Sequence, residues 1–124
     1  MAKIFLDANI LIDLVEKRGE VKPENFRDHD SIVSALSIHI LMYVLKKKVP
    51  FSRLLKKIEP FSIIDLSGEI CIQSLLGPIN DFEDNVQLHS AAKAECDFFF
   101  TQDKKLLNMK FFGKTEIVSP QVIY

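Results

Sequence analysis

Short apolar runs alternate along the chain with longer stretches in which apolar residues recur every three or four positions. The short runs, bounded by polar or turn residues, predict buried strands, and the periodic stretches predict helices packed on one side. The strands are expected at residues 3–6, 31–34, 61–64, 98–100 and 116–118. The helices are expected at residues 9–18, 37–48, 51–58, 68–76, 82–95 and 104–109.

This alternation predicts the fold class. Parallel strands need crossover connections, which usually contain a helix and place helices on both faces of the sheet. We therefore expect an α/β fold, a three-layer α/β/α sandwich around a central parallel sheet of four to five strands. A chain of 124 residues can bury one core but is short for two, so residues 1–124 are expected to form a single domain.

Two predictions concern how residues on the expected helices are placed relative to the core. One face of the helix at residues 37–48 is expected to point inward, formed by Ile40, Leu41, Val44 and Leu45. His39 and His89 also lie on expected helices beside apolar residues. No ligand spacing accompanies either histidine, so both are expected to be structural.

Charge and cysteine content limit which binding partners and which cellular compartment can be expected. The chain has 16 Lys+Arg against 17 Asp+Glu, a net charge of -1, so any binding of nucleic acid must come from a local basic patch. The two cysteines lack metal-ligand spacing and fit a reducing compartment. With neither a signal-peptide pattern nor a membrane-spanning stretch, a cytoplasmic location and no membrane partner are expected.

Three aspartates are placed where a parallel sheet would bring them together. Asp7 directly follows the first expected strand, Asp103 follows residues 98–100, and Asp84 opens the helix at residues 82–95. Ligand sites in open parallel sheets lie at the carboxyl ends of the strands, and a helix that precedes a strand begins at that same edge. Converging carboxylates repel one another unless a cation lies between them, so a site for Mg²⁺ or Mn²⁺ is expected.

Neighbouring polar residues are candidates for supporting roles. Asn9, Ser34 and Thr101 would orient water, phosphate or the carboxylates through hydrogen bonds, and Asn9 could also cap the first helix. Asp81 precedes Asp84 by three residues, which is close to capping-box spacing. Asp81 is therefore expected to cap the helix more than to bind a metal ion.

Three segments together resemble a known family. Residues 4–14, 33–48 and 81–107 are similar in order and spacing to the corresponding parts of PIN-domain proteins. This is the metal-dependent ribonuclease fold found in toxins of VapBC-type toxin–antitoxin pairs and in RNA-processing nucleases. The resemblance covers almost the whole chain and implies a metal-dependent endoribonuclease of cytoplasmic type.

The resemblance assigns roles to individual residues. Asp7, Asp84 and Asp103 match the metal-binding acids of the family, Asn9 matches a polar companion, and Thr101 matches a hydroxyl residue beside the last acid. These three aspartates are therefore the expected catalytic and metal-binding residues.

The chain departs from the family pattern at one position. Many PIN nucleases carry a glutamate early in the helix after the second strand, where this chain has Ile40. No acid occurs between Ser31 and Val49. A missing carboxylate weakens metal affinity and brings two-metal occupancy into question, which leaves a second interpretation open. This alternative is a degenerate, catalytically weak or inactive PIN module that binds RNA or protein.

Partners follow from the same resemblance. RNA is the expected substrate, an antitoxin protein is a possible partner, and a homodimer is expected because PIN relatives commonly dimerise. Lys104 and Lys105 adjoin Asp103 and are the expected phosphate contacts. Asp103 could instead simply cap the helix at residues 104–109. A dense basic region, for which a solvated helix face is the simpler explanation, comprises Lys46, Lys47, Lys48, Arg53, Lys56 and Lys57.

A third reading is an unrelated phosphotransfer domain of the haloacid-dehalogenase or receiver type, which also places an aspartate at a strand end. Those folds need further acids or a lysine elsewhere. The segment Asp7-Ala8-Asn9 lacks the second aspartate of the former.

Overall fold

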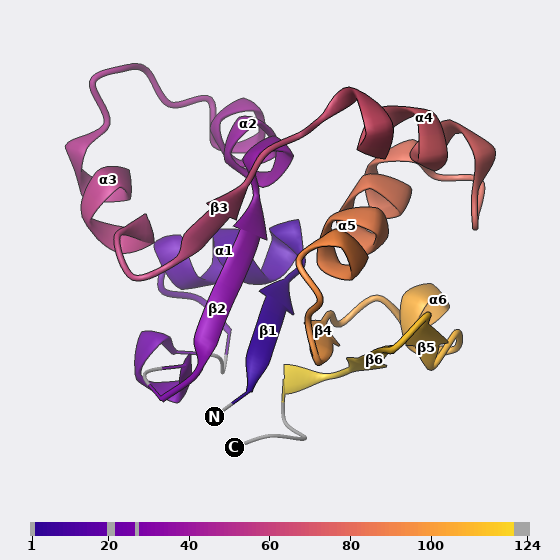
Figure 1. Ribbon diagram of the computed structural model, residues 1–124. Helices are drawn as coiled ribbons and strands as arrows, with labels where there is room; N and C mark the ends of the chain where they lie inside the picture. The colour runs from indigo at the N-terminus through magenta and orange to yellow at the C-terminus, as the bar shows by residue number, and fades with distance from the viewer. Residues whose placement is uncertain (1, 20–21, 27, 121–124) are drawn as a thin grey trace.

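Helices cover both faces of one mixed sheet in the computed structural model, which describes residues 2–19, 22–26 and 28–120 (Figure 1). The strands are β1 (Lys3–Leu6), β2 (Asp30–Ser34), β3 (Ser62–Ile64), β4 (Phe98–Phe100), β5 (Phe111–Phe112) and β6 (Thr115–Val118). The helices are α1 (Ala8–Val15), α2 (Ala35–Leu45), α3 (Ser52–Ile58), α4 (Gly68–Leu76), α5 (Phe82–Lys93), α6 (Lys104–Leu107) and a short 3-10 helix, η1 (Pro23–Phe26). The expected α/β fold with helices on both faces of the sheet is confirmed.

The strand order is β3-β2-β1-β4-β6-β5, with β1 near the centre of the sheet. β1 pairs in parallel with β2 on one side and with β4 on the other, so that Phe5 lies opposite Ile32 and Leu6 lies opposite Phe100. Asp7 and Thr101 directly follow β1 and β4, and Ser34 is the last residue of β2. The carboxyl edge of the sheet therefore collects polar residues from segments far apart in sequence.

The sheet differs from the expected one at its far edge. Within the described residues it has six strands rather than four to five, and β5 pairs with β6 in the antiparallel direction. A turn at Gly113-Lys114 joins them, and Gly113 adopts a φ of 60°. Glycine suits a positive φ at the first position of a two-residue hairpin turn. Two phenylalanines are too short a run to predict a strand, which is why sequence analysis missed β5.

Alternating side chains along the strands build two separate cores. On one face, Ile4 and Leu6 of β1 pack with α1, α2 and α3. On the other face, Phe5 packs with α5 and α6, and its ring stacks on Phe99 of β4 at 5.4 Å between centroids. Strand side chains alternate between faces, so β1 contributes to both cores and is buried within the sheet.

Helix ends follow local capping. α2 starts two residues earlier than expected because the Ser34 hydroxyl accepts a hydrogen bond of 3.0 Å from the Leu36 amide. It ends at Leu45 because Lys46 adopts a left-handed φ of 52°, which cannot continue a right-handed helix. Serine is a favoured cap because its oxygen satisfies an amide that the helix leaves free.

The helices within the described ranges are all too short or too polar to cross a lipid bilayer.

Candidate functional site

Asp7 lies at the carboxyl end of β1 and is 6% exposed. Its backbone amide donates to the Phe100 carbonyl at 3.0 Å, which continues the pairing of β1 with β4. Its carboxylate accepts a hydrogen bond of 2.7 Å from the Thr101 hydroxyl. Burial of a carboxylate is costly unless donors reach it, and this buried hydroxyl is one such donor.

Thr101 connects two of the expected acids. It is completely buried directly after β4, and its Oγ1 also accepts a hydrogen bond of 3.1 Å from the amide of Asp103. The hydroxyl thus orients the Asp7 carboxylate and fixes the backbone of Asp103. The structure places Thr101 beside both acids, and its role at a metal site stays a prediction.

Asp103 precedes α6, and one of its carboxylate oxygens accepts a hydrogen bond of 2.9 Å from the Lys105 amide. The capping role that sequence analysis left open is therefore present. A capping contact uses Oδ1, and a carboxylate has further lone pairs that can accept a second ligand. Capping and metal binding are compatible at this residue.

Asp84 lies half-buried in the first turn of α5. The pKa of its carboxyl is raised to about 6, mainly by burial and further by the negative charges of Asp81, Asp7 and Asp103. The positive charge of Lys105 acts in the opposite direction. The pKa of Asp84 therefore depends on the charges of both other candidate acids and of one of the two candidate phosphate-binding lysines.

Asp7 is affected by the same environment. Burial raises the pKa of Asp7, and the charge of Asp103 raises it further. Hydrogen bonds from Thr101 and from the backbone amides of Ala8 and Asn9 lower it in part. The three aspartates repel one another at one sheet edge, and this mutual repulsion is the electrostatic condition that a bound cation relieves.

The chemistry of this edge fits a hard divalent cation, because carboxylate oxygens are the ligands that Mg²⁺ and Mn²⁺ prefer. Within residues 2–19, 22–26 and 28–120, however, no three His, Cys, Asp or Glu side chains lie close enough together to form a ready metal-binding group. The acids share one region, and closer approach is needed before three of them could bind one ion.

The supporting residues occupy different positions. Asp81 is exposed and caps α5 by accepting a 2.9 Å hydrogen bond from the amide of Asp84, as expected. Ser34 is buried at the end of β2, where its hydroxyl caps α2. Asn9 is exposed in the first turn of α1. Lys104 and Lys105 are both exposed on α6.

The two histidines differ. His89 is structural, as expected, because its Nε2 lies 2.9 Å from the Gly77 carbonyl and its ring meets Phe112 edge-on. The same expectation is wrong for His39, which is exposed on α2 and stacks on Tyr43. Val44 was also expected to face inward and is 53% exposed. α2 is apolar on several sides, so its periodicity could not decide which side the core covers.

Two buried amides near the acids were missed by sequence analysis. Asn85, next to Asp84, donates from Nδ2 to the carbonyls of Ser74 and Ile79 and accepts from the Ile79 amide. It thereby fixes the loop that leads into α5. Its position next to Asp84 at the start of a predicted helix was the signal in the sequence that could have indicated it.

Gln87 lies one helical turn after Asp84 and is buried. Its Oε1 accepts a 3.1 Å hydrogen bond from the Ser37 hydroxyl, which joins α5 to α2 across the carboxyl edge of the sheet. Its Nε2 has no hydrogen-bond partner among the described residues. Gln87 follows Asp84 by three positions in the same predicted helix, and this spacing was the signal in the sequence that could have indicated it.

Comparison with known proteins gives the family. The PIN domain model matches residues 4–112. The chain belongs to the PIN domain family. The comparison with curated proteins gave no significant match.

Solved structures share the PIN fold. The chain is similar to VapBC2 from Rickettsia felis, crystallised with a DNA fragment from its promoter, with a TM-score of 0.70 and 16% identity. That match covers 94% of this chain and 98% of the other. The chain is also similar to PAE2754 from Pyrobaculum aerophilum, with a TM-score of 0.62 and 16% identity, covering 97% and 90% of the two chains. At such low identity these likenesses concern the fold.

Proposed function

We propose that this PIN domain is a Mg²⁺- or Mn²⁺-dependent endoribonuclease that hydrolyses phosphodiester bonds of RNA. The observation that carries the proposal is the meeting of Asp7 and Asp103 on the buried Thr101 hydroxyl at the carboxyl edge of the sheet. The family supports it, because PIN domains are typically nucleases and match this chain over residues 4–112.

The acidic and basic residues have separate roles in this proposal. Asp7, Asp84 and Asp103 would hold the metal ion, and Thr101 orients Asp7 for that role through its 2.7 Å hydrogen bond. A bound Mg²⁺ or Mn²⁺ supplies an activated water and neutralises charge that develops on the phosphate. Lys104 and Lys105 would contact substrate phosphates, since both are exposed beside Asp103.

The remaining polar residues have positioning roles in this proposal. Asn9 is exposed next to the buried Asp7 carboxylate and would meet solvent or phosphate there. Ser34 is occupied as the cap of α2, so it would act by fixing the start of that helix. Asp81 fixes the start of α5 and therefore the backbone of Asp84.

We further propose that the protein is the toxin of a toxin–antitoxin pair. The support is the similarity in fold to VapBC2 from Rickettsia felis, a complex crystallised on promoter DNA. A protein antitoxin would then be the natural partner of this chain. The homodimer expected from the family remains a prediction, which sedimentation of the purified protein would test.

A second candidate function is a degenerate PIN module that has kept the fold without turnover. Two observations favour it. Ile40 occupies the position of the usual glutamate, and the acids within the described ranges do not form a ready trio. Such a module would bind RNA or protein without hydrolysis.

Hydrolysis of labelled RNA separates the two candidates. The purified chain is expected to cut RNA with Mn²⁺ or Mg²⁺ and not with EDTA, and Asp7→Asn is expected to abolish cutting. Asp65→Asn is a matched control, because Asp65 also follows a strand but is exposed and does not affect the pKa of Asp7 or Asp84. Cleavage that survives Asp7→Asn would refute the assigned site, and no cleavage by wild type would favour the degenerate module.

A further inference from the structure

An aromatic pair on the exposed side of α2 has no role in the core. The rings of His39 and Tyr43 stack with their centroids 6.4 Å apart and an interplanar angle of 26°. Tyr43 is 76% exposed, and His39 is exposed as well. The two residues are four positions apart on the helix, so both rings lie on the same exposed side of it. Exposed aromatic surface of this kind is a common feature of binding sites.

This pair lines a hollow next to the acidic edge. The hollow has a volume of about 370 Å³ and is formed by His39, Ile40, Tyr43 and Val44 of α2 together with Glu83 of α5. Glu83 directly precedes Asp84 in the first turn of α5. The hollow therefore borders the first turn of α5, the turn that also carries Asp84.

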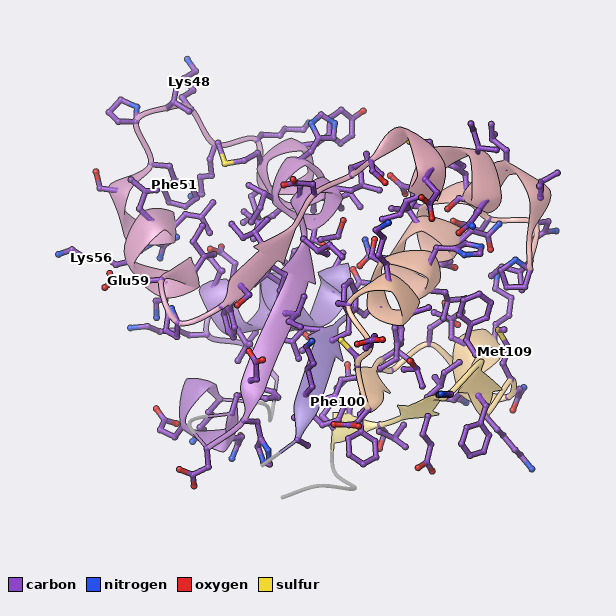
Figure 2. All side chains as sticks on the ribbon, viewed as in Figure 1. Lys48, Phe51, Lys56, Glu59, Phe100 and Met109 are labelled. Atoms are coloured by element: carbon purple, nitrogen blue, oxygen red, sulfur yellow. The ribbon has the colours of Figure 1, made fainter. Side chains whose placement is uncertain are left out.

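Cations follow directly after the same helix. α2 ends at Leu45, two residues after Tyr43, and leads into Lys46, Lys47 and Lys48. Lys46 and Lys48 are exposed and take part in no ion pair within the described parts of the chain. Lys47 lies over the ring of Phe51, 5.8 Å from its centroid. Figure 2 shows Lys48 projecting from the loop after α2, away from the body of the molecule.

We propose that the exposed side of α2 binds the single-stranded RNA that flanks the scissile bond. A base stacks on the His39–Tyr43 pair, and backbone phosphates lie beside Lys46 and Lys48. The identification of the ligand as RNA depends on the proposed function. The evidence for a binding surface is the stacked pair, the hollow and the lysines. Aromatic faces that alternate with cations are the usual means by which proteins hold single strands.

Charge favours this occupant over an apolar protein segment. Glu83 in the hollow repels phosphate and accepts hydrogen bonds from the amino groups of bases, so it favours a base at that point. The lysines attract phosphate just beyond the C-terminal end of the helix. A polyanion with flat, hydrogen-bonding bases matches both the hollow and the lysines.

Tyrosine fluorescence provides a direct test. The chain has no Trp and two Tyr, so Tyr124→Phe leaves Tyr43 as the only strong intrinsic fluorophore. The probe is a short 2′-O-methyl oligoribonucleotide, titrated in EDTA so that no metal-dependent cleavage occurs. A stacked base is expected to quench Tyr43. Binding without any quenching would overturn the proposal.

Affinity gives the second measurement, with matched variants. Stacking of a base on an aromatic ring implies that Tyr43→Ala binds the probe about 5- to 150-fold more weakly, whereas Tyr43→Phe stays within about 2-fold. Phe111→Ala is the control, because Phe111 is another exposed aromatic, on β5. Equal losses in Tyr43→Ala and Phe111→Ala would contradict a specific platform, and so would loss of binding to a co-encoded antitoxin with RNA binding unchanged.

Salt dependence tests the lysines. Each phosphate contact with a single strand contributes about 0.7 to the slope of log K against log salt, so Lys46→Ala with Lys48→Ala is expected to reduce the slope by about 1.4. Lys110→Ala with Lys114→Ala is the control, since both are exposed and Lys110 shares the left-handed backbone of Lys46. An unchanged slope in the first pair would remove the lysines from the binding track.

These measurements separate the inference from the proposed function. Quenching of Tyr43 by the probe in a protein that never cuts RNA would support the binding surface and refute the nuclease. Cutting of unmodified RNA with no quenching would refute the binding surface and support the nuclease. If both hold, Tyr43→Ala is expected to raise KM about 5-fold or more while kcat stays within about 2-fold of wild type.

Discussion

The Thr101 hydroxyl donates a 2.7 Å hydrogen bond to the Asp7 carboxylate, joining residues that are 94 positions apart in the sequence. The same oxygen accepts from the Asp103 amide at 3.1 Å. Because Thr101 is completely buried, it cannot exchange this contact for one with bulk water. The orientation of Asp7 therefore depends on the end of β4 as well as on β1.

Thr101→Val removes the hydroxyl and keeps the shape of the side chain. Hydrogen bonds to charged groups contribute about 1.5–3 kcal/mol, so the free energy of unfolding at neutral pH is expected to fall by about 2 kcal/mol. The hydroxyl lowers the pKa of Asp7, so the loss should grow as pH rises and Asp7 ionises. Urea unfolding at several pH values measures this.

Thr101→Ser is the control for that experiment. It keeps the hydroxyl and loses a buried methyl group, so its cost should not depend on pH. If the two variants have the same pH dependence, the hydrogen bond to Asp7 does not set the charge state of that carboxyl.

Asp84 makes the metal-free protein less stable as pH rises through the titration of this group. Its pKa is about 6 in the folded protein against 3.8 for the unperturbed group. The folded state therefore holds the proton more tightly, and this contribution to stability is full below about pH 3.8 and lost as pH rises through about 6. Asp84→Asn should remove that part of the pH dependence in unfolding experiments with EDTA.

A metal ion should reverse this effect. Mn²⁺ or Mg²⁺ binds the ionised form, so it should raise the melting temperature of wild type at pH 7 and much less at pH 4. Asp65→Asn should respond as wild type does, because Asp65 is exposed and does not affect the pKa of Asp84. A metal effect that is equal at both pH values would argue against binding by these carboxylates.

Ile40→Glu introduces an acid at the position where the family resemblance predicts one. Ile40 is half-buried and lines the hollow next to Glu83. A further carboxylate near the other acids is expected to tighten Mn²⁺ binding roughly tenfold, since affinity for hard cations rises with ligand charge. Calorimetric titration with Mn²⁺ measures the change, and Ile40→Gln provides a neutral side chain of similar length. Equal affinities in the two variants would show that position 40 does not reach the metal site.

Asn85→Ala should destabilise the start of α5. Asn85 is buried and makes hydrogen bonds of 2.9, 2.8 and 3.1 Å with the backbone of Ser74 and Ile79. Loss of these bonds leaves buried backbone groups unpaired, so a cost of about 2–3 kcal/mol in unfolding free energy is expected. Ser74→Ala is the matched control, because the Ser74 hydroxyl is buried without a hydrogen-bond partner among the described residues. It should be neutral or slightly stabilising.

Local signals predicted much of the fold. The strands at residues 3–6 and 98–100 and the helix at residues 68–76 have the bounds expected from apolar patterning and capping. Ser67 caps α4 through its bond to the Ile70 amide. Apolar patterning and capping residues can be recognised from neighbouring positions in the sequence.

Features that depend on distant contacts were not predictable. β5 is a strand only because β6 lies beside it. Val44 and His39 are exposed because the core covers another side of an apolar helix. Asn85 holds a loop whose path is set by α4, against which α5 packs.

The sequence by itself determined that Asp7, Asp84 and Asp103 lie at strand ends or at a helix start. Turn and capping residues can be recognised from their immediate neighbours in the sequence. Tertiary structure decided that Thr101 joins Asp7 to the backbone of Asp103 and that His39 and Tyr43 face solvent beside Glu83. The physical reason is register. Strand pairing and helix packing fix which distant side chains meet, and neither is recorded in the spacing of residues along the chain.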